Sequence, residues 1–67
     1  MITQKQQDRI NTLSLELVNS LVEKREYTPE EAQTTVEDLL KEYEMDIKWG
    51  EINMLERDMK IYIKYGM

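Results

Sequence analysis

The sequence predicts a small all-α protein, a bundle of three helices that forms one domain over residues 1–67. Apolar residues recur every three or four positions along most of the chain, which is the spacing of amphipathic helices. Thr3 and Thr28 are each followed, three residues later, by Gln or Glu, a pattern typical of helix N-termini. No repeat, linker or low-complexity tract divides the chain, so we expect one compact unit.

The first predicted helix covers residues 4–25. Thr3 is the expected N-cap and Gln6 completes a capping box. The apolar residues of this helix are Ile10, Leu13, Leu15, Leu17, Val18, Leu21 and Val22. At about 100° per residue they spread over an arc of roughly 200°, which is wide enough for two neighbours. We therefore expect the first helix to be the central one.

The second predicted helix covers residues 29–48 and has the strongest start signal in the chain. Thr28 is the expected N-cap, Pro29 occupies the first helical position, and Glu31 completes the capping box. The apolar stripe of this helix consists of Ala32, Val36, Leu39, Leu40 and Tyr43. It spans about 100° of arc, as expected for a helix that packs on a core.

The third predicted helix covers residues 51–65 and carries two apolar stripes. The core-facing stripe consists of Ile52, Leu55, Met59, Tyr62 and Ile63. The other stripe, Met54, Ile61 and Tyr65, lies roughly 135° around the helix. A bundle formed by one copy of the chain needs only the first stripe.

Two alternatives concern this part of the chain. The second and third helices can be joined through Gly50, because a heptad-like seam continues across it. That seam consists of Val36, Leu40, Tyr43, Ile47, Gly50, Met54, Arg57 and Ile61. Separately, residues 60–65 alternate with the period of a β-strand and are rich in aromatic and β-branched residues.

Composition excludes several classes of function. The chain has no cysteine and no histidine, so disulfides, zinc sites and the commonest catalytic groups are excluded, and we expect neither an enzyme nor a cofactor. The formal charge of −5 argues against direct binding to nucleic acid, which needs Lys and Arg against the phosphates. No run of about 20 apolar residues occurs, so we expect a cytoplasmic protein with no membrane contact.

The net charge is confined to one segment. Residues 28–44 contain six carboxylates and one cation, Lys41, and this difference of five equals the whole net charge. The carboxylates are Glu30, Glu31, Glu37, Asp38, Glu42 and Glu44. They fall opposite the apolar stripe, so a solvated helix side explains them in part. However, Asp38 and Glu42 are like charges four residues apart, and Glu42 and Glu44 lie at an unfavourable helix end, which stability alone does not favour.

Apolar residues beyond the needs of a small core suggest an interface. The candidates are Trp49, Met54, Ile61 and Tyr65, together with Met45. Trp, Tyr and Met are enriched where proteins meet. A chain this short has a marginal core without a staple, so we expect completion by homo-oligomerisation, as a dimer.

The sequence therefore predicts a non-enzymatic protein that acts by stoichiometric association with another protein. The acidic face would bind a partner with a basic surface, as in an inhibitor or regulator of a nucleic-acid-handling protein of the phage or mobile-element accessory type. One alternative is a purely structural homo-oligomer. Another is a helix-turn-helix DNA-binding regulator, because Arg57, Lys60 and Lys64 share one side of the third helix.

Overall fold

The computed structural model describes residues 2–65, and these are helical apart from short connections, as predicted. The helices are α1 (Gln4–Lys24), α2 (Pro29–Glu42), α3 (Glu44–Lys48) and α4 (Asn53–Tyr65). Within the described residues there are thus four helices where the sequence predicted three. The additional one arises because the predicted helix 29–48 is divided in two.

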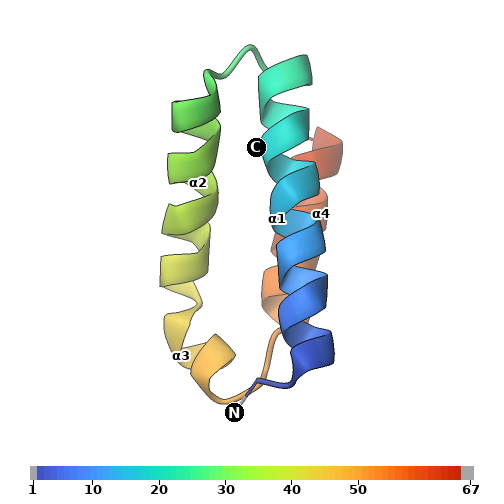
Figure 1. The fold of residues 1–67 in the computed structure, drawn as a ribbon, viewed down its shortest axis with the longest axis vertical. Helices are drawn as coiled ribbons and strands as arrows, with labels where there is room; N and C mark the ends of the chain where they lie inside the picture. Colours follow the sequence, from blue (N-terminus) through green and yellow to red (C-terminus); the bar gives the residue numbers. More distant parts are fainter. Residues whose placement is uncertain (1, 66–67) are drawn as a thin grey trace.

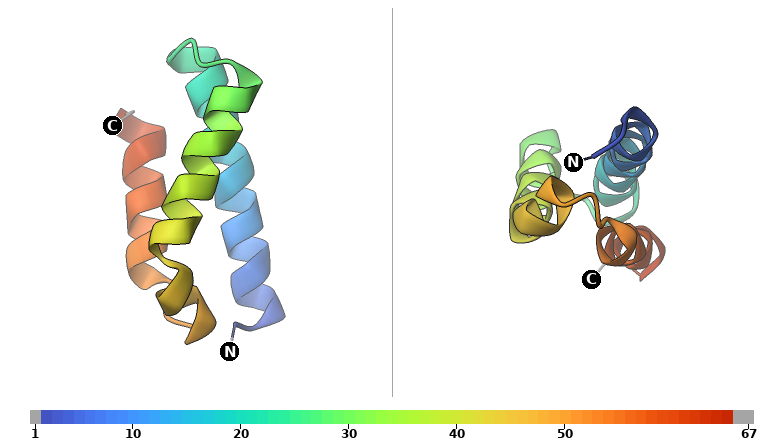
Figure 2. Two further views of the ribbon diagram at one scale, coloured as in Figure 1. Left: turned by 90° about the vertical axis from the view of Figure 1, so that its left-hand side faces the viewer. Right: turned by 90° about the horizontal axis from the view of Figure 1, so that it is seen from below.

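The three long helices lie side by side in an elongated bundle of 35 × 18 × 17 Å (Figure 1). α2 runs in the opposite direction to α1 and α4, and the view along the bundle shows the three at the corners of a triangle (Figure 2). α1 contacts both α2 and α4. The wide apolar arc of α1 is used on both sides, as its sequence predicted.

The core lies along the axis of this triangle. Its buried members are Ile10, Leu13, Leu17, Leu21, Ala32, Val36, Leu39, Ile52, Leu55 and Met59. All ten come from the three predicted stripes. Helical spacing therefore identified every buried apolar residue, although the predicted arc of α1 also included Leu15, which is exposed.

Both predicted helix starts are confirmed. The Thr3 hydroxyl accepts a hydrogen bond from the N–H of Gln6 (3.1 Å), and the Gln6 side chain accepts one from the N–H of Thr3 (2.9 Å). Thr28 and Glu31 make the same reciprocal pair at the start of α2, with both distances 3.1 Å. Each capping box satisfies two backbone donors that the helix itself leaves free.

The prediction of an unbroken helix over residues 29–48 is wrong, because α2 ends at Glu42 and α3 starts at Glu44. Tyr43 separates them with φ −101° and ψ 17°, outside helical geometry. Its hydroxyl donates to the Asp58 carboxylate on α4. The break lies where this tertiary contact is made, and Tyr43 is not a residue that breaks helices by itself.

The alternative of a continuous helix through Gly50 is also wrong. Gly50 has φ 76° and follows the last turn of α3. The N–H of Glu51 donates to the carbonyl of Asp46 (2.9 Å), and the N–H of Gly50 donates to the carbonyl of Ile47 (3.0 Å). This is the Schellman ending of a helix, which reverses the chain toward α4.

Replacing Gly50 with alanine should destabilise the protein by about 1–2 kcal/mol, because a Cβ is unfavourable at this left-handed backbone position. Chemical denaturation followed by far-UV circular dichroism measures the change. Gly50→Asn is the control, because asparagine tolerates the left-handed region, so this variant should lose less stability than Gly50→Ala. Equal losses for the two variants would contradict the backbone explanation.

The C-terminal segment is helical, so the alternative of a strand at residues 60–65 is wrong as far as Tyr65. α4 starts at Asn53, two residues after the predicted start. The buried Ser20 hydroxyl of α1 donates to the carbonyl of Ile63 (3.2 Å), which ties this end of α4 to the bundle. No helix within residues 2–65 has both the length and the apolarity needed to cross a membrane.

Candidate functional site

The six carboxylates of the predicted acidic face are all exposed. Five lie on α2 and the sixth, Glu44, opens α3. In the part of the chain that the structure describes, the only ion pair joins Arg9 and Glu56, so none of the six is paired with a cation. Glu31 has one structural role, since its side chain caps the start of α2. The other five carboxylates have no side-chain hydrogen bond within residues 2–65.

Four of the six carboxylates divide into two groups on the two sides of α2, whereas Glu30 and Glu31 lie together at its start. The depression between α2 and α4 is lined by Thr35, Asp38, Leu39, Glu42 and Tyr62. The depression on the other side of α2 is lined by Glu37, Leu40, Lys41, Glu44 and Ile47. The first group thus lies beside α4, whereas the second lies beside the half-buried apolar side chains of Leu40 and Ile47. The sequence predicted one acidic face, and the structure shows that its two edges have different neighbours.

Acidic side chains also alter the titration of Tyr43. The hydrogen bond that its hydroxyl donates to Asp58 raises the pKa of Tyr43 above its usual value, with desolvation and the negative charges of Asp58, Glu42 and Asp46 adding to this effect. Because the folded pKa lies above the unfolded one, this interaction stabilises the fold fully below about pH 10. The contribution is lost as the pH rises through the folded pKa.

We expect the phenolate absorbance of Tyr43 to develop above the usual pH of about 10. The Tyr43 component is isolated by subtracting the titration of a Tyr43→Phe variant. Asp58→Asn should move the midpoint downward, since it removes both the acceptor carboxylate and its charge. If Tyr43 titrates with the same midpoint in the wild type and in Asp58→Asn, the hydrogen bond to Asp58 is not the cause of the raised pKa.

The predicted apolar interface residues are largely exposed. The exposed fraction is 69% for Trp49, 58% for Met54 and 59% for Tyr65, whereas Ile61 is half-buried. Met54, Ile61 and Tyr65 share the side of α4 that faces away from the core, and Trp49 lies in the turn after α3. Nothing within residues 2–65 covers the three exposed side chains.

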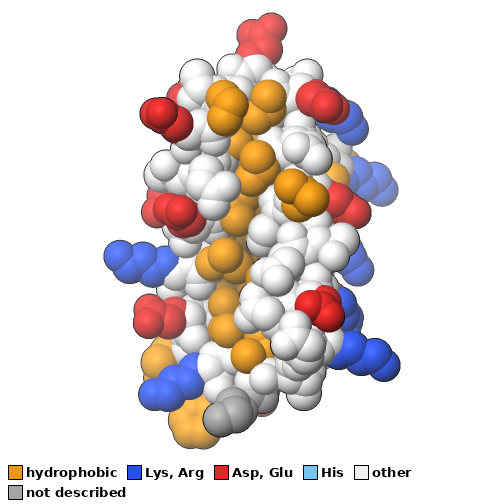
Figure 3. All heavy atoms as spheres, viewed as in Figure 1, with side chains coloured by type: hydrophobic (Ala, Val, Ile, Leu, Met, Phe, Trp, Pro, Cys, Tyr) orange, Lys and Arg blue, Asp and Glu red, His pale blue; other side chains and the backbone are white. Residues whose placement is uncertain are grey.

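A second apolar surface was not predicted. Arg9 and Ser20 mark the side of α1 that contacts α4. Leu15, Val18 and Val22 lie roughly 130–170° around the helix from that side, at about 100° per residue. With Leu40 and Ile47 of the depression beside α2, they form what we call the α1–α2 furrow. Of these five side chains Leu15 is exposed, and the other four are half-buried against the core. Figure 3 shows hydrophobic side chains in a strip that follows the boundary between α1 and α2.

The sequence contained a signal for this furrow. Asn11, Leu15, Val18 and Val22 follow one another at spacings of four, three and four residues, which is a second seam on α1. The sequence predicts that two neighbouring helices cover the wide apolar arc of α1. The structure shows that α2 and α4 leave one edge of this arc uncovered. Leu15 remains 64% exposed.

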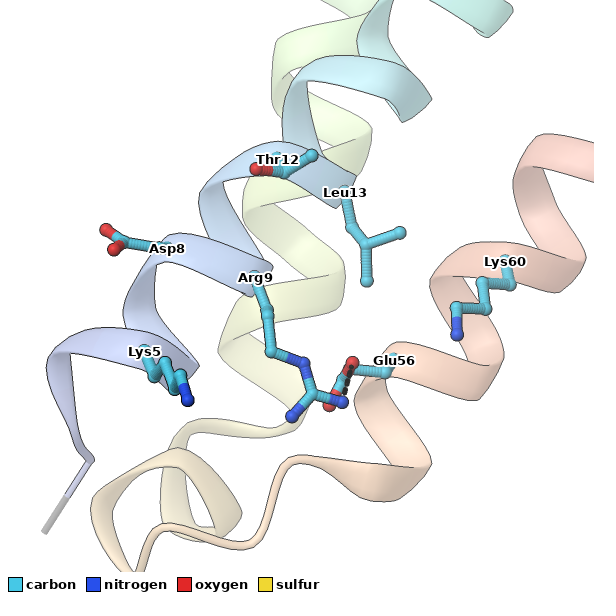
Figure 4. Close-up of a pocket in the computed structure, with 7 residues that line it drawn as sticks. All are labelled: Lys5, Asp8, Arg9, Thr12, Leu13, Glu56 and Lys60. Atoms are coloured by element: carbon cyan, nitrogen blue, oxygen red, sulfur yellow. Dashed lines mark ion pairs between the residues drawn. The ribbon is translucent and has the colours of Figure 1, made fainter.

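A groove between α1 and α4 has more cations than carboxylates among its lining residues. It is lined by Lys5, Asp8, Arg9, Thr12, Leu13, Glu56 and Lys60 (Figure 4). One Arg9 guanidinium nitrogen, Nη2, lies 2.7 Å from Oε2 of Glu56, while Oε1 of Glu56 is buried without a hydrogen-bond partner. Glu56 is 5% exposed, which the sequence did not predict. Glu56 lies four residues after Ile52 and seven before Ile63, at the edge of the core-facing stripe, and this spacing was the signal that could have placed it in the interface.

Neither metal chemistry nor a known relative supplies a further clue. Within residues 2–65, no group of three or more His, Cys, Asp or Glu side chains could hold a metal ion. Comparison of the chain with protein-family models, curated proteins and solved structures finds no match. The fold and surface define a class only, a small helical bundle with an acidic helix and uncovered apolar side chains.

Proposed function

We propose that this protein acts without catalysis, by stoichiometric association with another protein through the acidic face of α2 and α3. The observation that carries the proposal is the exposure of all six carboxylates without a paired cation. These charges oppose folding slightly where they repel each other, so their concentration on α2 and the start of α3 is better explained by a partner. Complementary charge raises association rate and fixes orientation.

The partner in this proposal presents a basic surface. A protein that handles nucleic acid has such a surface where phosphates normally bind, and carboxylates on a rigid helix can occupy it. Residues four apart on a helix have Cβ atoms about 5–6 Å apart, so Asp38 and Glu42 present two adjacent negative charges. An inhibitor or regulator of the phage or mobile-element accessory type would act in this way.

The experiment that tests this proposal is a charge reversal. The wild-type protein and a variant with Glu37, Asp38 and Glu42 changed to lysine are used to capture partners from the native host, and captured proteins are identified by mass spectrometry. A direct partner should bind the wild type more weakly as salt increases, and should not bind the variant. The control is Glu16→Lys on α1, another exposed glutamate, which should bind normally.

Circular dichroism of each variant shows whether helicity is retained. Capture of the same partner by the folded triple variant, or binding that does not change with salt, would remove the acidic face from the proposal. A gel shift with DNA at low salt tests the helix-turn-helix alternative separately, since a DNA-binding protein retains at least weak non-specific affinity there.

A second candidate function is homo-oligomerisation through the outer side of α4. It is favoured by the exposure of Trp49, Met54 and Tyr65, which are large side chains that a stable dimer would cover. Sedimentation equilibrium over a wide concentration range should show a dimer, and Met54→Ser with Tyr65→Ser should shift it to monomer. A monomer at high concentration would eliminate this candidate.

A further inference from the structure

We infer that the α1–α2 furrow is a docking site for a cationic amphipathic helix of a partner protein. This inference rests on the proposed function and names the part of the partner that is bound. The α1 wall of the furrow is apolar or neutral, since its seam consists of Asn11, Leu15, Val18 and Val22. The α2 wall combines Leu40 and Ile47 with carboxylates.

The shape of the furrow fits a helix. The furrow lies between the antiparallel helices α1 and α2 and follows them along most of the molecule (Figure 3). A helix of the partner that lay in it would therefore contact both α1 and α2. The 4,3 spacing of the α1 seam is the spacing by which helices interdigitate. Covering Leu15, which is 64% exposed, would remove the largest apolar side chain of that seam from water. The docked helix would complete a four-helix arrangement.

The charges beside the furrow determine the sign of the charge that we expect on the bound helix. Glu30 and Glu37 lie two turns apart on one side of α2, and Glu44 opens α3 beyond the break at Tyr43. Glu37 and Glu44 line the same depression as the apolar floor residues, and Lys41 is the one cation among its lining residues. Figure 3 shows acidic side chains on both sides of the hydrophobic strip, with Lys and Arg side chains on both sides as well. Lys and Arg flanking the apolar side of a bound helix would meet these carboxylates.

The same charges disfavour a second copy of this chain as the occupant through a symmetric contact. In a two-fold dimer each furrow would face the other furrow, so Glu37 and Glu44 of one copy would approach like charges on its partner. Like charges brought together in an interface are unfavourable. A helix-in-groove complex with a basic partner has no such conflict.

The test uses two designed peptides of about 20 residues, long enough to match the length of α1. Both carry leucine at 4,3 spacing, and the flanking positions are lysine in one and glutamate in the other. We expect fluorescence anisotropy to show that the lysine peptide binds at least about tenfold more tightly than the glutamate peptide at low salt. The double variant Glu37→Gln with Glu44→Gln should bind the lysine peptide at least about threefold more weakly, and its affinity should depend less on salt.

The double variant Leu15→Ser with Val22→Ser tests the apolar part of the site and should bind the lysine peptide about tenfold more weakly. Leu15→Ser alone is the second variant if the pair does not fold, since Leu15 contributes little to the core. The matched control is Met54→Ser, which removes an apolar side chain of similar exposure to Leu15 on the outer side of α4 and should leave binding unchanged.

The possible outcomes separate the furrow from the acidic face. If the serine variants bind the lysine peptide like the wild type while the glutamine variant does not, the furrow is overturned and the acidic face of the proposed function stands. If the glutamine variant binds like the wild type, the cationic character of the partner is overturned. Failure of both peptides to bind overturns the docking site, as does a wild-type dimer that Leu15→Ser dissociates.

Discussion

Leu17→Ala should destabilise the protein by about 3 kcal/mol, within the range of about 2–5 kcal/mol for deletion of a fully buried leucine side chain. Leu17 is 0% exposed and lies at the centre of the helix that contacts both neighbours. A chain of 67 residues has a free energy of unfolding of roughly 3–10 kcal/mol. One substitution at this position therefore removes a large part of the total stability.

The chain contains a matched control for this result two positions away. Leu15 is the same residue type on the same helix and is 64% exposed. Leu15→Ala should change the free energy of unfolding by less than about 0.5 kcal/mol, since it removes little buried surface and alanine is a good helix former. Urea unfolding followed by circular dichroism gives both values. Similar losses at the two positions would contradict the burial assigned to α1.

The helices and the core could be predicted because their signals are local. Apolar spacing placed all ten core residues, and the capping boxes at Thr3 and Thr28 placed two helix starts. The break at Tyr43 carries no such signal. It accompanies a hydrogen bond to Asp58, fifteen residues away, and a contact of this kind depends on how α4 returns along the bundle.

The turn at Gly50 was ambiguous for a different reason. A glycine within a helix costs about 1 kcal/mol, which a heptad seam on either side can offset. The seam from Val36 to Ile61 was therefore compatible with one long helix. What decides against it is the fold of the whole chain, because the turn lets α4 pack its core stripe on α1 instead of extending away from it.

The surface could be predicted in composition but not in arrangement. Helical periodicity placed the six carboxylates opposite the core of α2, and they are exposed. It could not show that Glu37 and Glu44 lie beside the furrow whereas Asp38 and Glu42 lie beside α4, since this depends on the side of α2 that each neighbour occupies. The furrow itself follows from the same tertiary fact, namely that α4 covers one side of the α1–α2 pair.

Arg9→Ala should destabilise the protein by about 2 kcal/mol, although Arg9 has no role in the apolar core. Removing it leaves the Glu56 carboxylate, which is 5% exposed, without its cation. Breaking a fully buried pair costs about 3–5 kcal/mol, and an exposed pair contributes about 0–1 kcal/mol. The Arg9 side chain is 58% exposed, so water screens part of the interaction and the expected loss lies between these limits.

A double-mutant cycle separates the charge of Glu56 from the packing of Arg9. In a Glu56→Gln background the buried group is neutral, so Arg9→Ala should cost less than half of its value in the wild type, and the coupling between the two sites should be more than about 1 kcal/mol. Lys60→Ala is the control, because Lys60 lines the same groove without pairing with a carboxylate of the described residues. Its effect should stay within about 0.5 kcal/mol. If Arg9→Ala and Lys60→Ala cost the same, the groove between α1 and α4 is held together by apolar packing, and the ion pair contributes nothing specific to the position of α4.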